Sequence, residues 1–260
     1  MKIKNYIQNK TVLITGATSG IGKQLAINLS VLDCHLVLVA RDIEKLQALK
    51  EGLQKKTEID VAIYQLDVRD KSQVTDLMAK IVQNKTIDIL INNAGLALGL
   101  NRIDSGDMDQ WDDMIDTNVK GLLYVSRAVI PQMRTLPTAH IVNIGSVAGK
   151  SAYPKGNVYC ATKAAVHSLG QSMNADLLGT AIKVTTVAPG AVETNFSNVR
   201  FLGDKKKAQS VYQGYTPLSA QDISELIVYV LNTPKHVNIQ HVDIMPTAQR
   251  SPYLLDNSGH

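Results

Sequence analysis

The feature that most constrains the fold of this chain is a regular alternation of short apolar runs with longer amphipathic segments. Seven runs rich in β-branched residues are typical of strands, at 11–16, 35–41, 61–67, 87–95, 140–146, 183–190 and 241–246. The first six are almost continuously apolar, as in strands that a parallel sheet buries on both faces. Five segments with apolar residues at helical spacing lie between them, at 21–32, 42–56, 71–83, 110–133 and 159–178. The alternation predicts an α/β fold, a doubly wound, seven-stranded and mainly parallel sheet flanked by helices.

Length, composition and charge narrow the class of protein. The 260 residues are 45% hydrophobic and 19% charged, without linker or repeat, so we expect one globular domain over residues 1–260. A net charge of +4 with interspersed signs argues against nucleic acid as a partner. No run reaches the ~18 apolar residues of a membrane span, and the first ten residues lack the apolar core of a signal peptide. With only two distant cysteines, Cys34 and Cys160, the chain is predicted to be cytoplasmic, with free thiols and no membrane partner.

The first predicted strand ends in a glycine-rich turn. In a doubly wound sheet, ligands bind beyond the carboxyl ends of the strands. The first of these ends carries TGATSGIG, with Gly16, Gly20 and Gly22. Glycines allow a tight turn and a close approach of backbone N–H groups to a phosphate at a helix N-terminus. Many such turns contain glycines for conformational reasons alone, but this position favours a nucleotide-binding loop.

The second predicted strand ends in Ala40-Arg41-Asp42 rather than in an acidic residue. An acidic side chain there would bind a ribose 2′-hydroxyl, as NAD requires. A small residue followed by a guanidinium instead leaves room for a 2′-phosphate and pairs with it. Arg41 could also be a surface residue at a helix start, and Asp42 is the expected cap of that helix. We favour NADP over NAD as the cofactor.

A phenol and an ammonium lie four residues apart in NVYCATKAAV, at Tyr159 and Lys163. Residues at this spacing meet on one face of a helix. Most such pairs are ordinary packing, with the lysine stem along the ring. The alternative is a proton-transfer pair, and the rest of the sequence favours it.

Seven motifs occur in order along the chain: TGxxxGxG at 15–22, LDV at 66–68, NNAG at 92–95, NVKG at 118–121, Ser146, YxxxK at 159–163 and PG at 189–190. Together they resemble the short-chain dehydrogenase/reductase family, over nearly the whole chain from about residue 10 to 247. The resemblance implies a Rossmann-type fold, an NADP-dependent oxidoreductase and a homotetramer.

The resemblance also implies roles for individual residues. Pyrophosphate, ribose and adenine contacts fall to Gly16, Ser19, Gly20, Ile21, Asp67, Val68, Asn93, Ala94 and Gly95. The nicotinamide side would be met by Pro189, Gly190, Val192 and Thr194, with Tyr159 and Lys163. The catalytic residues would be Asn118, Ser146, Tyr159 and Lys163.

The implied chemistry explains the pairing of the phenol with the ammonium. Oxidation of an alcohol or reduction of a carbonyl needs one proton to move at the substrate oxygen. Tyrosine has a reference pKa near 10, so forming its phenolate near pH 7 takes about 4 kcal/mol of stabilisation. Lys163 and the oxidised nicotinamide would supply positive charge, and Lys163 would also hold the ribose hydroxyls. Ser146 would orient the substrate oxygen, and the Asn118 backbone carbonyl would hold a water that relays protons.

Residues 191–219 form a long polar segment that we expect to fold into a lid over the substrate. The stretches NFSNVRF, NNAGLALG and HVNIQHVDIMPTAQR resemble the branch of NADP-dependent 3-hydroxy acid dehydrogenases, which act on serine and L-allo-threonine. Such substrates carry a carboxylate, and Arg200 is the candidate clamp for it, or else faces solvent or a neighbouring subunit. Alternatives are a reductase of another carbonyl class, such as a sugar, aldehyde or acyl-carrier ketone, or a non-catalytic NADP(H)-binding module.

The remaining features predict no further chemistry. The six histidines form no clustered motif, so we expect no metal. The acidic stretch 104–113 is expected to open the long helix that follows. The tail 246–260 has little reason to fold alone, and we expect it to lie at a subunit interface.

Overall fold

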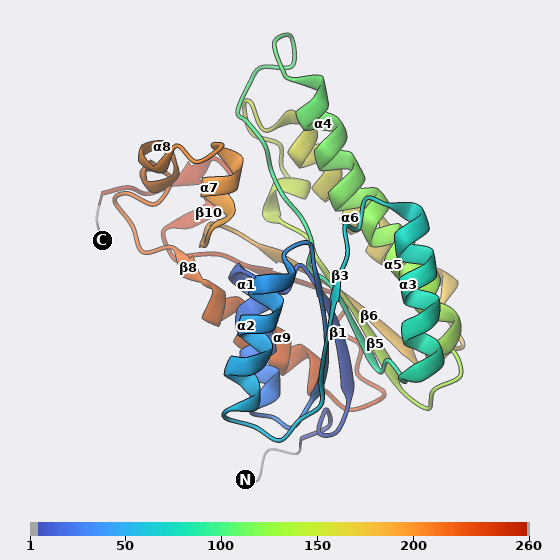
Figure 1. The fold of residues 1–260 in the computed structure, drawn as a ribbon. Coiled ribbons are helices and arrows are strands. Elements are labelled where there is room, and N and C mark those ends of the chain that lie inside the picture. Colours follow the sequence, from blue (N-terminus) through green and yellow to red (C-terminus); the bar gives the residue numbers. More distant parts are fainter. Residues whose placement is uncertain (1–4, 259–260) are drawn as a thin grey trace.

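The protein is described by a computed structural model (Figure 1), which covers residues 5–258. The first four residues of the predicted non-signal N-terminus and the last two of the tail lie outside this range. The main sheet has the order β3-β2-β1-β4-β5-β6-β9, and every neighbouring pair is parallel. Its strands are β1 (Thr11–Thr15), β2 (His35–Ala40), β3 (Val61–Gln65), β4 (Ile89–Asn92), β5 (Ala139–Ile144), β6 (Ile182–Pro189) and β9 (His241–Ile244). The predicted seven-stranded, doubly wound fold is confirmed.

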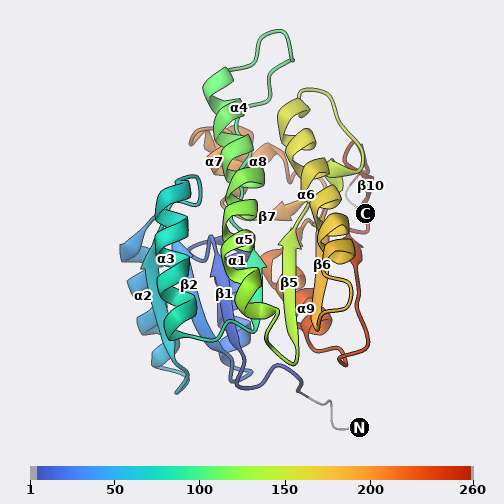
Figure 2. The same ribbon diagram turned by 90° about the vertical axis from the view of Figure 1, so that its right-hand side faces the viewer.

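Helices cover both faces of the sheet (Figure 2). The long ones are α1 (Gly20–Ser30), α2 (Ile43–Gln54), α3 (Lys71–Asn84), α4 (Met108–Ile115), α5 (Leu122–Met133), α6 (Asn157–Asp176) and α9 (Ala220–Leu231). On one face, α1, α2 and α9 bury side chains such as Leu25 and Leu46 against the strands. On the other, α3, α5 and α6 bury Met78 and Val166 in a second cluster. The β-strands are therefore buried from both sides, which explains their continuous apolar runs.

Polar side chains fix where several helices begin. Asp42 accepts a hydrogen bond from the Lys45 backbone N–H at 3.0 Å and caps α2, as its position in the sequence predicts. Asp107 caps α4, so the acidic stretch does open that helix. Ser219 and Asp222 form a capping box at the start of α9, a helix outside the five segments predicted from the sequence.

The helix predicted over 110–133 is one continuous path but not one α-helix. A π-helical segment, η1 (Asp116–Gly121), separates α4 from α5. Such segments insert an extra residue per turn and often lie at functional sites. Here the segment contains Asn118.

The lid region contains more regular structure than a polar loop. It includes β7 (Val192–Glu193), α7 (Phe196–Arg200), α8 (Lys205–Ser210) and β8 (Leu218–Ser219), and β7 pairs with β8 in parallel. In Figure 1 these elements stand beyond the carboxyl ends of the strands, opposite α4 and α6. The segment thus lies where a lid over a site at the sheet edge is expected.

The tail returns to the lid of its own chain. Strands β10 (Gln249–Ser251) and β11 (Leu254–Leu255) form an antiparallel hairpin. The buried Gln249 side chain accepts a hydrogen bond from the Ala191 backbone N–H at 2.9 Å, and a Cβ on Gly190 would lie 2.3 Å from its Oε1 atom. The tail therefore has intramolecular packing, and its place at a subunit interface stays a prediction.

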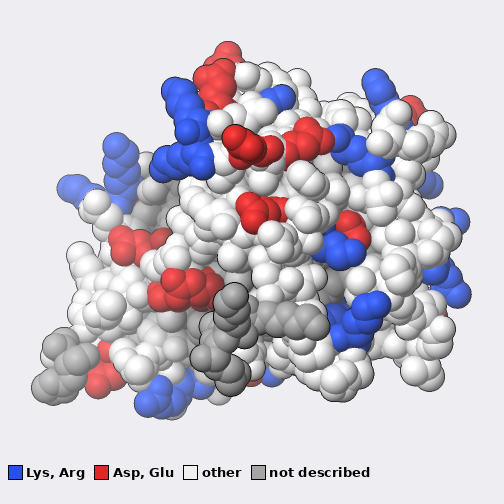
Figure 3. Space-filling view, turned by 90° about the horizontal axis from the view of Figure 1, so that it is seen from below, with Lys and Arg blue, Asp and Glu red and all other residues white. Residues whose placement is uncertain are grey.

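Surface charge is mixed on the face seen from below, where Lys and Arg side chains alternate with Asp and Glu (Figure 3). Within residues 5–258, no helix combines the length and apolar character needed to cross a membrane. Cys34 and Cys160 are both buried and unpaired.

Candidate active site

A cavity of about 960 Å³ opens at the carboxyl ends of the strands. The order of the strands reverses between β1 and β4, and loops that leave in opposite directions create a crevice at such a point. Nearly all predicted site residues line this cavity: Gly16, Ser19, Gly20, Ile21, Arg41, Asp42, Asp67, Val68, Asn93, Ala94, Gly95, Ser146, Tyr159, Lys163, Pro189, Gly190, Val192 and Thr194. Gly22, Asn118 and Arg200 are the predicted residues that do not.

The glycine-rich turn after β1 is packed against the NNAG segment after β4. Gly16 has a φ of +66°, and a Cβ there would lie 2.9 Å from the Cα of Ala94. The Asn93 amide donates to the carbonyl oxygens of Thr15 and Gly16 at 2.9 and 3.0 Å. Gly22 faces this amide, with room for no Cβ. Gly22 and the Asn93 side chain therefore shape the loop, while the backbone of the loop faces the cavity.

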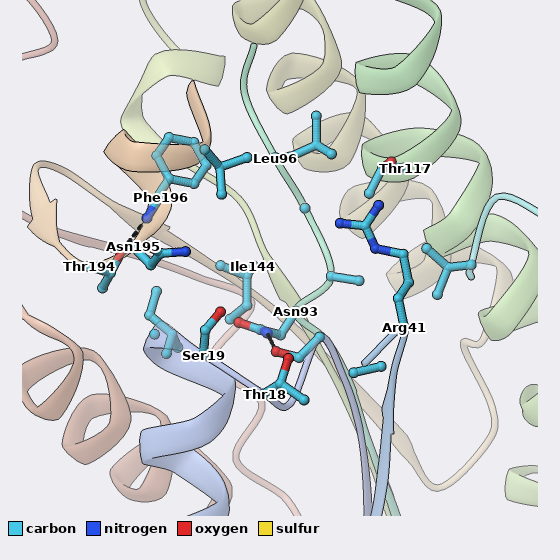
Figure 4. A pocket seen from close by; sticks show the side chains of 18 of the residues that line it. Thr18, Ser19, Arg41, Asn93, Leu96, Thr117, Ile144, Thr194, Asn195 and Phe196 are labelled. Carbon is cyan, nitrogen blue, oxygen red and sulfur yellow. Dashed lines mark hydrogen bonds between the residues drawn. The ribbon is translucent and has the colours of Figure 1, made fainter. Parts of the chain in front are cut away.

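The end of β2 brings positive charge to the cavity. Arg41 is exposed, and its guanidinium points into the space below Thr117 of η1 (Figure 4). Lys45, in the first turn of α2, also lines the cavity and forms an ion pair with Asp42 at 2.7 Å. Hydrogen bonding to Lys45 lowers the pKa of Asp42, so this carboxylate is ionised and already paired with Lys45. Lys45 is not among the residues predicted from the sequence, although its spacing four residues after Arg41 at a helix start is a usable signal.

The side chain of Asp67, expected to meet the adenine amino group, is already paired. Arg69 donates to both of its oxygens, and the Asp67 Oδ2 atom lies 3.0 Å from Nε and 2.7 Å from Nη2. Partial burial raises the pKa of Asp67, but the hydrogen bonds and charge of Arg69 outweigh it and the net shift is downward. Arg69 also pairs with Asp113 of α4. An adenine amino group would have to share this carboxylate with Arg69.

Tyr159 and Lys163 lie on the first turns of α6 and are buried, at 8% and 6% exposure. The Lys163 ammonium donates to the Ile144 carbonyl oxygen at 2.8 Å and lies 6.0 Å from the centre of the Tyr159 ring. Burial lowers the pKa of Lys163 to about 8. The helix thus brings the two groups to one end of the cavity.

The protonation of Tyr159 in the chain alone differs from the sequence-based expectation. Burial raises the pKa of Tyr159, and proximity to Tyr153 adds to the shift. A hydrogen bond with Ser146 and the charge of Arg200 oppose it without reversing it. The expected lowering invokes the positive charges of Lys163 and of the oxidised nicotinamide, and in the chain alone desolvation of the phenolate opposes it.

Ser146 lies at the start of a short helix, and Asn118 lies within η1. Ser146 follows β5 and caps the short helix η2 (Val147–Gly149), accepting from the Ala148 N–H at 3.1 Å. The Asn118 side-chain amide accepts a hydrogen bond from the Leu96 backbone N–H and donates one to the Leu96 carbonyl oxygen, both at 2.8 Å. It also donates to Thr162 Oγ1 at 3.0 Å. Asn118 therefore acts from behind the cavity wall, tying the loop after β4 to α6.

Arg200 reaches the same end of the cavity from the lid. Its guanidinium carbon lies 5.6 Å from the centre of the Tyr159 ring and 5.5 Å from that of Tyr153. Its Nε donates to the Gly99 carbonyl oxygen at 3.3 Å. It lines a small second pocket that also includes Tyr159. Within this chain Arg200 therefore packs against the aromatic end of the site rather than extending into solvent.

Three apolar or aromatic neighbours of the site are not among the predicted site residues, although Leu96 and Phe196 lie within the stretches NNAGLALG and NFSNVRF. The Phe196 ring lies 5.7 Å from that of Tyr159, and Figure 4 shows Phe196 and Leu96 on the same side of the cavity. Tyr153 comes from the loop before α6. No pattern in the sequence marks these three side chains as neighbours of Tyr159, so only the structure identifies them. In the part of the chain that the structure describes, no three potential metal ligands come together.

Comparison with known proteins agrees with this geometry. The family model of short chain dehydrogenases matches residues 10–204. The chain is 45% identical to an NADP-dependent 3-hydroxy acid dehydrogenase of Salmonella typhi, over 92% of this chain and 95% of that protein. It is 43% identical to a sulfoacetaldehyde reductase of Chromohalobacter salexigens, over 94% and 97%. The closed form of a serine dehydrogenase complexed with NADP+ superimposes with a TM-score of 0.88 at 42% identity, covering 92% of this chain and 96% of that one. On motif, fold and cavity together, the chain belongs to the short-chain dehydrogenase family.

Proposed function

We propose that this protein is an NADP-dependent oxidoreductase that transfers a hydride between the nicotinamide and C3 of a small 3-hydroxy acid. The observation that carries the proposal is the position of Arg200 over the Tyr159 ring at the end of a dinucleotide-sized cavity. A guanidinium there can pair with a substrate carboxylate while the phenol meets the hydroxyl. The relatives named for NADP, 3-hydroxy acids and serine support this assignment.

The residues present fit NADP. The turn at Gly16 has no room for a Cβ, so its backbone N–H groups can approach a phosphate closely. Arg41 and Lys45, which line the other end of the cavity, favour a 2′-phosphate. Asn93 to Gly95 and Lys163 would hold the sugar next to the nicotinamide. When bound, the cofactor would accept or supply the hydride.

Tyr159 would move the proton at the substrate oxygen, as general base in oxidation and general acid in reduction. Because burial raises its pKa, the phenol keeps its proton at neutral pH in the chain alone, which favours the acid role. Ser146 would orient the substrate oxygen through its hydroxyl. Lys163 and the carbonyl of Asn118 would connect Tyr159 to solvent protons.

A second candidate is reduction of a small aldehyde that carries a sulfonate. The 43% identical sulfoacetaldehyde reductase favours it. Arg200 is equally suited to both substrates, because carboxylate and sulfonate oxygens both accept hydrogen bonds from a guanidinium.

The experiment is an absorbance assay at 340 nm with NADP or NAD, across 3-hydroxy acids, sulfoacetaldehyde, sugars and simple alcohols. We expect turnover of L-serine or L-allo-threonine with NADP, and little with NAD. Preference for sulfoacetaldehyde would select the second candidate, and activity confined to substrates without an acid group would contradict both. Loss of turnover in Tyr159→Phe by about 10²-fold or more is expected for an acid/base residue. An unchanged rate would contradict that role for Tyr159, whereas NADP binding without turnover of any substrate by the wild-type protein would favour the binding-module alternative.

We also propose a homotetramer that contains the tail in its interfaces, located in the cytoplasm. Two unpaired buried thiols suit a reducing compartment. Sedimentation or light scattering of the full chain measures the assembly directly.

A further inference from the structure

His167 lies on α6 one turn after Lys163, and its ring touches the segment that bears Ser146. The Nε2 atom of His167 is 2.8 Å from the Ser146 carbonyl oxygen. A carbonyl oxygen only accepts, so the proton of the imidazole lies on Nε2. This hydrogen bond joins α6 to the end of β5, the two elements that carry Tyr159 and Ser146.

The segment around Ser146 is shaped to receive this ring. A Cβ on Gly145 would lie 3.3 Å from His167 Nε2, and one on Gly149 would lie 2.6 Å from His167 Cδ2. The Gly149 Cβ would also lie 2.5 Å from the Lys163 carbonyl carbon. Glycines on both sides of Ser146 therefore open onto one imidazole, and the short helix η2 rests directly on the turn of α6 that carries Lys163.

The other side of the imidazole faces strand β9. The rings of His167 and His241 are 4.9 Å apart, centre to centre. His241 pairs with Asp243 at 2.7 Å, and Lys150 pairs with the other oxygen of Asp243 at 2.6 Å. These neighbours hold the His167 ring from behind while its Nε2 points at Ser146.

The charge state of His167 suits a side chain that donates one fixed hydrogen bond. Burial lowers the pKa of His167, and the nearby His241 and Lys150 lower it further, against the Ser146 carbonyl and Asp243, which raise it. A neutral imidazole has a single N–H, and here that N–H is committed to Ser146. His167 does not line the cavity, and its Nε2 is hydrogen-bonded to the Ser146 carbonyl oxygen, so it is placed to support the site rather than to bind the reacting groups.

We propose that His167 is a positioning residue that fixes Ser146, through the carbonyl of its own peptide, at the distance from Tyr159 that proton transfer requires. The inference rests on the proposed function, because it assigns the Ser146 hydroxyl the task of orienting the substrate oxygen. Loss of the Nε2–H donor is expected to let the 145–149 segment shift and so to slow the chemical step rather than to weaken cofactor binding.

The test compares His167→Gln with His167→Met, two side chains of similar length of which only glutamine donates. With the best substrate of the panel above, we expect His167→Met to lower kcat about tenfold, the usual scale of one hydrogen bond, with the KM for NADP unchanged. His167→Gln should keep at least about a third of the wild-type kcat. Equal kcat values for the two variants, whether both high or both low, would overturn the inference.

A double-mutant cycle separates positioning from general destabilisation. If His167 acts through Ser146, adding His167→Met to Ser146→Ala should reduce the residual rate by less than about twofold. A further loss of about tenfold would show that His167 acts independently of Ser146 and contradict the proposal. If Ser146→Ala itself keeps full activity, the role given to Ser146 in the proposed function fails, and the inference with it. Should His167→Met not fold, His167→Asn, whose amide is too short to reach the carbonyl, replaces it with the same expected loss.

Discussion

At the scale of single residues, the site depends on charges that are held close to an aromatic hydroxyl. Arg200 lies over Tyr159 and Tyr153, and its Nε donates to the Gly99 carbonyl oxygen. A guanidinium has more N–H donors than these contacts use, so it can also bind an acidic substrate. The lid residue thus links substrate recognition to the proton-transferring end of the cavity.

Arg200→Met tests this link. Because charge-assisted hydrogen bonds contribute about 1.5–3 kcal/mol, we expect the KM for the acidic substrate to rise by about 10- to 100-fold. The rate with a simple alcohol that lacks an acid group should change by less than about threefold, and it serves as the control. Equal losses with both substrates would show that Arg200 supports the Tyr159 region rather than the substrate.

The pKa of Lys163 predicts how the rate depends on pH. Burial lowers this pKa to about 8, so the ammonium is present below that pH and is lost above it. Reduction consumes a proton, and its kcat is therefore expected to be level below about pH 8 and to fall above it. Rate measurements from about pH 6 to 10 check this, with Lys163→Met as the variant in which the inflection should disappear. A wild-type profile that stays flat over the whole range would contradict the assigned role.

At the scale of elements, the seven strands and their doubly wound arrangement could be predicted from the sequence, and several helices could not. Strands buried on both faces leave a continuous apolar run, which is a strong local signal. Helices α7 and α8 are only five and six residues long and depend on packing rather than on their own propensity. The π-segment around Asn118 depends on bonds to Leu96 and Thr162, which are distant in sequence. Helix α9 could have been predicted, because its Ser219–Asp222 capping box is a local signal.

The same division holds for the site. Residues in motifs, such as the glycine turn and the Tyr159–Lys163 pair, could be placed at the cavity from the sequence alone. Arg69 and Tyr153 could not, because their importance comes from their spatial contacts rather than from a motif. Phe196 lies in the stretch NFSNVRF, but its contact with Tyr159 is visible only in the structure. Local patterns predict the backbone frame, and tertiary contacts complete the site.

Strand β5 contains a buried histidine, His140, from which we expect the stability of the fold to decrease in acid. His140 is 3% exposed, its Nε2 lies 2.8 Å from Thr185 Oγ1, and its Nδ1 has no partner among the described residues. Burial lowers its pKa to about 3 from an ordinary value of 6.5, with repulsion from Lys183 adding to the shift. Between these pH values the unfolded chain binds a proton that the folded chain does not, so stability falls as the pH falls.

The slope is measurable. We expect the free energy of unfolding to decrease below about pH 6.5 by up to about 1.4 kcal/mol per pH unit from this residue. In His140→Gln, which retains a donor for Thr185 but cannot titrate, this decrease should be smaller by that amount. Urea unfolding at about pH 5, 6 and 7 makes the comparison, and identical slopes in both proteins would exclude His140 as the source.

At the scale of the whole molecule, one cavity is built from loops at both halves of the sheet. The loops after β1, β2, β4, β5 and β6 all contribute to its lining. A ligand that fills it contacts segments across the sheet, so binding should stabilise the fold as one unit.

Thermal unfolding tests whether the chain unfolds as one unit. We expect a single transition, raised by NADP at about a hundred times its Kd by about 2.7 kcal/mol, which is roughly 5–10 °C for a domain of this size. NAD at the same concentration should give a smaller rise because Arg41 and Lys45 have no 2′-phosphate to bind. Two separate transitions would contradict a single domain, and equal shifts with NAD would contradict the cofactor preference.

The hairpin near the C-terminus has a practical consequence. Through Gln249 it is bonded to Ala191 at the base of the lid and fills the space beside Gly190. An affinity tag or fluorescent fusion placed behind the hairpin would lie close to the base of the lid, whereas β1 begins at the opposite end of the strands (Figure 1). Expression vectors for kinetic work on this protein should therefore carry their fusions at the N-terminus.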